Sequence, residues 1–88
     1  MDDVERWRHE FPFLDGENPV AYLDNGASTQ KPRAVIERMR EFTGHEYANV
    51  HRGIHELSER ATAVYEAARE RARSFFNAAS AESIVFVR

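Results

Sequence analysis

The sequence predicts an α/β fold, mostly helical with two short strands, and three observations point to it. Two stretches, 32–44 and 57–77, repeat apolar residues at helical spacing. Residues 84–87 are four consecutive apolar side chains, a pattern typical of a strand buried on both faces of a parallel sheet. The other strand candidate is residues 20–23, and two short strands cannot build such a sheet. We therefore expect residues 1–88 to be the N-terminal segment of a larger domain, with no complete catalytic domain present.

The first half of the chain predicts a helix, a turn, a strand and a second turn. Val4, Trp7 and Phe11 lie at helical spacing in the stretch 4–14 and predict a helix that Pro12 would stop. Residues 15–19 form a turn cluster before the predicted strand 20–23. Asn25-Gly26 then predicts a turn, because this dipeptide tolerates positive φ.

The second half is dominated by two amphipathic helices. One begins with Pro32 at or near its first turn and fades near Gly44 or a few residues beyond. The other covers about 57–77, with Ser58 as a candidate N-cap and Asn77 as a C-terminal stop. It carries two favourable i,i+3 pairs on its polar side, Glu66 with Arg69 and Glu70 with Arg73.

Composition excludes several classes of function. The net charge is −3 and the 12 basic residues are interleaved with 15 acidic ones, which argues against a nucleic-acid or anionic-membrane surface. No apolar run approaches the roughly 20 residues that span a bilayer, and the acidic start has no secretory h-region. The prediction is a cytoplasmic protein. These residues include no cysteine, and Lys31 alone could form a Schiff base.

The stretch "NVHRGIH" at 49–55 leaves three interpretations open. A metal site is weakly supported, since "HELSE" has Glu59 where a zinc-protease motif needs a second histidine. A structural role is common for such residues, with Arg52 paired to Glu56. An anion-handling loop is the third, because Arg offers a planar fork, His can donate a proton and Gly permits close approach. The small residues of "DNGAS" at 24–28 are a second place of this kind.

Four blocks in order resemble the N-terminal segment of the group II cysteine desulfurases, in the class V aminotransferase family. They are "RWRHEFPFL", "AYLDNGASTQKP", "YANVHRGIHELSERAT" and "RARSFFNAASAESIVFVR". The resemblance covers residues 4–88. It implies a homodimeric pyridoxal-phosphate (PLP) enzyme of fold type I that converts L-cysteine to L-alanine and an enzyme persulfide. The sulfur then passes to an acceptor protein for iron–sulfur cluster assembly.

The resemblance also implies roles for particular positions. Asn25, Gly26 and Ala27 match the substrate end of the active site, where many relatives have Ala in place of Gly26. A second set, near the active-site entrance and dimer interface, has a supporting role: His51, Arg52 and His55.

No catalytic residue and no metal ligand is assigned to these residues. Lys31 does not match the PLP-binding lysine of the family, whose phosphate loop, Schiff-base lysine and persulfide cysteine lie further on. The isolated segment is therefore expected to bind no PLP and to be inactive. Two alternatives remain at this stage: a small non-catalytic helical interaction or dimerisation module, and a selenocysteine lyase or kynureninase-like relative.

Overall fold

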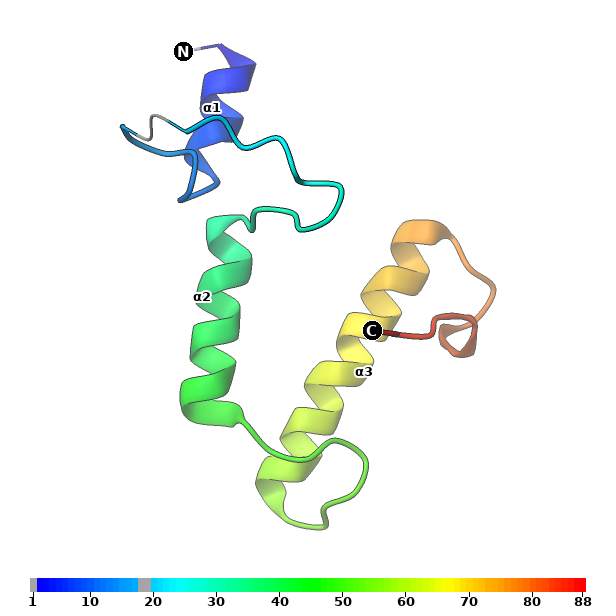
Figure 1. The fold of residues 1–88 in the computed structure, drawn as a ribbon. Helices are drawn as coiled ribbons and strands as arrows, with labels where there is room; N and C mark the ends of the chain where they lie inside the picture. The colour runs from blue at the N-terminus through cyan, green and yellow to red at the C-terminus, as the bar shows by residue number, and fades with distance from the viewer. Residues whose placement is uncertain (1, 18–19) are drawn as a thin grey trace. The chain divides into compact units, whose positions relative to one another are not determined.

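The computed structural model describes residues 2–17 and 20–88, and its regular elements are helical (Figure 1). The chain divides into two compact units, Met1–Thr43 and Gly44–Arg88. The elements follow in this order: α1 (Asp3–His9), α2 (Arg33–Glu41), a π-helical turn (Phe42–Glu46), α3 (Glu56–Phe76) and a 3₁₀ turn (Ala81–Ser83). Part of the predicted turn 15–19 falls on residues 18–19, outside the described residues.

The two predicted strands are wrong. Neither 20–23 nor 84–87 forms a strand in the part of the chain that the structure describes. Ile84 nevertheless has the backbone of a strand, with φ −97° and ψ 120°. Residues 84–87 therefore start out extended as predicted, but no partner strand lies alongside to bond their N–H and C=O groups. The mostly helical part of the prediction is confirmed.

Helix α1 begins at a side-chain cap and ends earlier than predicted. The Asp2 carboxylate accepts a hydrogen bond of 2.8 Å from the Glu5 N–H, which satisfies one of the free donors of the first turn. The helix ends at His9, before Phe11, which the predicted helix included. The reason is Pro12, which lacks an N–H and disfavours helical dihedrals at Phe11 before it.

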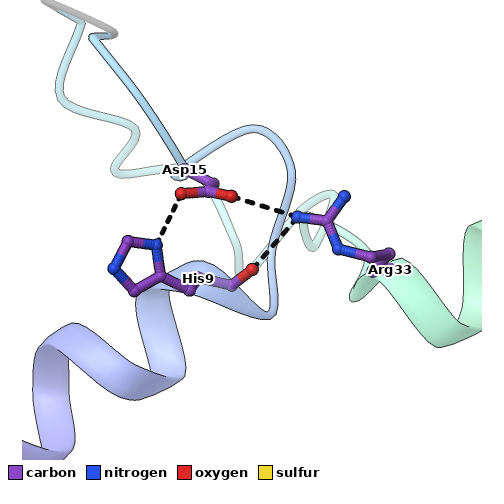
Figure 2. Close-up of polar contacts among 3 residues, drawn as sticks. All are labelled: His9, Asp15 and Arg33. Atoms are coloured by element: carbon purple, nitrogen blue, oxygen red, sulfur yellow. Dashed lines mark hydrogen bonds and ion pairs between the residues drawn. The ribbon is translucent and has the colours of Figure 1, made fainter.

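A polar clamp of His9, Asp15 and Arg33 closes the segment between α1 and α2 (Figure 2). The Asp15 carboxylate receives His9 Nδ1 at 2.6 Å on one oxygen and Arg33 Nη2 at 3.1 Å on the other. The same Arg33 nitrogen donates to the His9 carbonyl at 3.1 Å, and the Arg33 N–H donates to the Glu10 carbonyl at 2.7 Å. The clamp therefore joins the two ends of residues 10–32, the stretch that contains Asn25.

Helix α2 starts where the sequence predicts. Pro32 is its N-cap, with φ −67°, and the helix passes into the π-helical turn that contains Gly44. Its apolar face includes Ile36 and Met39, which are 43% and 55% exposed. The described residues of this unit therefore leave part of that face uncovered.

Helix α3 confirms the predicted range to within one residue at each end. Its N-cap is His55 and not Ser58, because the His55 ring accepts the Ser58 N–H and Ser58 lies inside the first turn. Asn77 ends the helix in the left-handed conformation, φ 55° and ψ 39°, as the sequence indicates. The predicted pairs form, with Glu66 beside Arg69 and Glu70 beside Arg73. The hydrogen bond from Arg73 lowers the pKa of the exposed Glu70 carboxyl.

Few apolar side chains are buried. Among the described residues, the fully buried ones are Ala61 and the polar Ser58. Phe75 and Phe76 are 84% and 71% exposed at the end of α3. Polar contacts between loops and helices therefore contribute much of the local order. In the described part of the chain, every helix is too short or too polar to cross a bilayer.

We predict that the left-handed cap at Asn77 sets the end of α3. Asn77→Val should destabilise the last turn by about 1–2 kcal/mol, because a β-branched side chain clashes at positive φ. Asn77→Gly should retain or increase helicity. Far-UV circular dichroism across a urea series compares the two, and equal helicity in both variants would contradict the prediction.

Candidate functional site

The first predicted site is a turn closed by its own residues. The Asp24 carbonyl accepts the N–H groups of Ala27 and Ser28 at 3.1 and 3.0 Å. The Asn25 side-chain oxygen accepts the Gln30 N–H at 3.0 Å, and the Asn25 carbonyl accepts the Thr29 hydroxyl at 2.7 Å. Asn25 therefore accepts two of the hydrogen bonds that close the turn, one at its carbonyl and one at its side chain, and the predicted turn is confirmed.

Gly26 is not required by backbone conformation. Neither Asn25 nor Gly26 has positive φ, so the expected reason for the turn is wrong although the turn forms. A Cβ at Gly26 would meet nothing within 4 Å. Asn25 also lines a pocket of about 440 Å³, but Gly26 and Ala27 do not. The other residues that line this pocket are Arg8, Leu14, Val20, Ala21, Tyr22 and Leu23.

The second predicted site, residues 49–55, is fastened to α3 by Ser58. The buried Ser58 hydroxyl donates to the Asn49 carbonyl at 2.6 Å and accepts the Gly53 N–H at 3.0 Å. The Ser58 N–H donates to His55 Nδ1 at 3.2 Å. A Cβ at Gly53 would overlap the Ser58 side chain, so only glycine fits there.

His51 is held in an uncommon backbone conformation. Its φ of 65° lies in the left-handed region, which costs a non-glycine residue about 1–2 kcal/mol. The conformation is supported from α3: the His51 N–H donates to Thr62 Oγ1 at 2.9 Å, and Nε2 lies 2.7 Å from Glu66 Oε1. The ring also packs edge-to-face on Tyr65, with centroids 5.4 Å apart.

The two histidine rings present opposite chemistry. A carboxylate only accepts, so His51 carries a proton on Nε2 and donates from it to Glu66. A backbone N–H only donates, so His55 accepts on Nδ1 and its neutral ring leaves Nε2–H as a donor. The loop therefore offers the His55 Nε2–H as a free donor close to Arg52 and Gly53.

Arg52 is the cation of this loop. It is exposed, and no hydrogen bond or ion pair engages its guanidinium among the residues described. The predicted pair with Glu56 is wrong, because Glu56 Oε1 lies 2.6 Å from Arg60 Nη2, one turn along α3. With the donor on His55, Arg52 makes the loop suited to a carboxylate or another anion. In the described part of the chain, no group of three or more His, Cys, Asp or Glu side chains is placed to hold a metal ion.

Sequence reasoning missed the residues of α3 that support this loop. Glu66 and Arg69 were expected on the solvent side, but the Arg69 side chain is only 20% exposed. Its Nη1 donates to the Ile84 carbonyl at 2.6 Å, and its guanidinium lies over the rings of Tyr65 and Phe86. The signal that could have found them is the spacing of Thr62, Glu66 and Arg69, which places three polar groups along one face of α3.

Both loops lie within the residues that match the family model of the class V aminotransferases. The family model for these proteins, "Aminotransferase class-V", matches residues 21–88. The chain therefore belongs to the class V aminotransferase family.

Within this family, the chain is similar to relatives that are named cysteine desulfurases. A cysteine desulfurase of Pectobacterium atrosepticum is 60% identical over 97% of this chain and 22% of its own length. A cysteine desulfurase of Synechococcus elongatus is 48% identical over 98% of this chain and 14% of its own. A probable cysteine desulfurase of Mycobacterium leprae is 48% identical over 98% and 15%. The chain thus spans about a fifth or less of the length of these relatives.

We predict opposite effects of adding a methyl group at the two site glycines. Gly53→Ala should destabilise the loop by on the order of 2 kcal/mol, because the Ser58 side chain it would overlap is buried and bonded. Gly26→Ala should stabilise the chain by about 0.4–1 kcal/mol, because its Cβ meets open space. Thermal unfolding by circular dichroism checks both, and a tolerated Gly53→Ala would contradict the geometry of the loop.

Proposed function

We propose that this chain is the N-terminal segment of a PLP-dependent cysteine desulfurase of fold type I. One observation carries the proposal: relatives named cysteine desulfurase are 48–60% identical over 97–98% of this chain. That similarity includes both candidate site loops. The resemblance of the four sequence blocks to group II desulfurases supports the same assignment.

The proposed reaction takes sulfur from L-cysteine. The C–S bond of the substrate breaks, an S–S bond forms on an enzyme cysteine, and L-alanine is left. PLP, when bound, supplies the electron sink for this step. We propose that the residues of this chain do not complete its site by themselves. Lys31 is exposed and makes no polar contact with any described residue, and the sequence contains no cysteine. We propose that the lysine and the cysteine belong to the part of the relatives' length that this chain does not span.

The two loops would serve the substrate from this segment. Asn25, Gly26 and Ala27 are proposed to line its substrate end, which their compact turn without bulky side chains would suit. His51, Arg52 and His55 are proposed to lie at the entrance or at a dimer interface, in a supporting role. The unengaged guanidinium of Arg52 has the charge to attract the carboxylate of an amino acid.

The surroundings proposed for the whole enzyme come from the family resemblance. They are a homodimer, a sulfur-acceptor protein, iron–sulfur cluster assembly and the cytoplasm. A second candidate function, a non-catalytic interaction module, is favoured by the exposed Phe75 and Phe76. Sedimentation separates the two, because self-association through this face alone would raise the mass of the isolated chain with concentration.

A chimera tests the proposed function directly. We predict that these 88 residues, replacing the matching segment of the Pectobacterium atrosepticum desulfurase, give an enzyme that releases alanine and sulfide from L-cysteine. Lys31→Ala should leave this activity within about twofold, since the lysine side chain is exposed and makes no polar contact with any described residue. A folded, PLP-loaded chimera without activity would refute the assignment.

The isolated chain provides the complementary test. We predict that it develops no absorbance band of bound PLP on titration and releases no alanine. The physical reason is that Lys31 is exposed and no described residue makes a polar contact with it. A stoichiometric PLP band that disappears in Lys31→Ala would contradict this prediction.

A further inference from the structure

We propose that Glu66 is a positioning residue that sets the geometry of the loop 49–55 and ties it to residues 84–86. The proposal rests on the proposed function, since it assigns Glu66 a part in presenting that loop to substrate. The supporting observation is a chain of contacts along one face of α3, from His51 to Glu66, from Glu66 to Arg69, and from Arg69 to the Ile84 carbonyl.

The run begins at the loop. One Glu66 oxygen lies 2.7 Å from His51 Nε2 and thereby fixes both the proton on that nitrogen and the direction of the ring. The neighbouring Thr62 hydroxyl accepts the His51 N–H at 2.9 Å. Together they hold a residue whose positive φ is unfavourable by itself. Arg52 follows directly in the chain, so the direction in which its backbone leaves His51 is set by the same contacts.

The run continues to the C-terminal segment. The second Glu66 oxygen lies 3.1 Å from Arg69 Nε, which is buried and makes no hydrogen bond among the described residues, so the attraction is Coulombic. Arg69 in turn donates to the Ile84 carbonyl at 2.6 Å. The rings of Tyr65 and Phe86, 5.3 Å apart, run beside it, and Figure 1 shows the red C-terminal segment turned back toward α3. Glu66 thus contacts both His51 in the loop and Arg69, the residue that bonds the C-terminal segment.

Glu70 provides a matched control on the same helix. It pairs with Arg73 at i,i+3 as Glu66 pairs with Arg69, and Arg73 likewise donates to a carbonyl, that of Ala78. Glu70 has no contact with the loop among the described residues. Replacing it removes the same charge and an i,i+3 pair with an arginine, so the two variants differ chiefly in the contact to the loop.

The experiment compares Glu66→Met, Glu66→Gln and Glu70→Met in the chimera. Glu66→Met should increase hydrogen exchange of residues 49–55 at least about tenfold and raise KM for L-cysteine about tenfold, with a smaller change in kcat. Glu66→Gln, which keeps an acceptor for His51, should restore most of the protection. Glu70→Met should resemble the parent chimera in both measurements.

The failures are distinguishable. If the chimera is inactive, the proposed function fails, and loop exchange still tests the positioning role. In the 88-residue chain, imidazole ¹H–¹⁵N correlation spectra should show the His51 Nε2–H tautomer in Glu70→Met and a mixture of tautomers in Glu66→Met. Equal exchange, KM and tautomer in Glu66→Met and Glu70→Met would overturn the proposal.

Discussion

The hydroxyl of Ser58 is the contact on which the candidate loop depends. It is fully buried and makes two hydrogen bonds to the loop backbone, one as donor to Asn49 and one as acceptor from Gly53. A buried hydroxyl without partners would cost roughly 1–3 kcal/mol, so burial and bonding of Ser58 require each other. The close approach leaves no room for a side chain at residue 53. The glycine in "HRGIH" is therefore explained by packing against Ser58, and by no special backbone angle of its own.

A second consequence of this contact is the start of α3. With Ser58 drawn under the loop, its N–H points to the His55 ring, and a histidine takes the position that Ser, Thr, Asp or Asn usually fills. The sequence alone favours Ser58 as cap, because the preference of the residue type is known and the loop contact is not. Here a contact nine residues apart in sequence, from Ser58 to Asn49, outweighs the local preference.

The sequence predicts those features of the fold that depend on residues close together in the chain, and it fails for those that depend on distant partners. Helix α3 and its stop at Asn77 depend on spacing and on one left-handed residue, so the sequence predicts them well. The strands depend on partners, which sequence pattern cannot supply: Ile84 is extended, but no ladder forms around it in the described residues. The turn at Asn25 is predicted correctly for a different reason, since the side chain of Asn25 closes it without positive φ. The role of Glu66 could not be predicted, because it requires knowing that His51 returns to α3.

The two candidate sites consequently respond differently to change. The turn at 24–30 is closed by bonds no more than six residues apart in sequence, so its shape is a local property. The loop at 49–55 takes its shape from Ser58, Thr62 and Glu66, which lie on successive turns of one helix. Any shift or fraying of α3 therefore moves His51 and the neighbouring Arg52 with it, while the turn at Asn25 does not share that coupling. Because the loop 49–55 is held by α3, a change in that helix would alter how the loop contacts a ligand. The turn at 24–30 is closed by its own hydrogen bonds, so its contact surface stays the same.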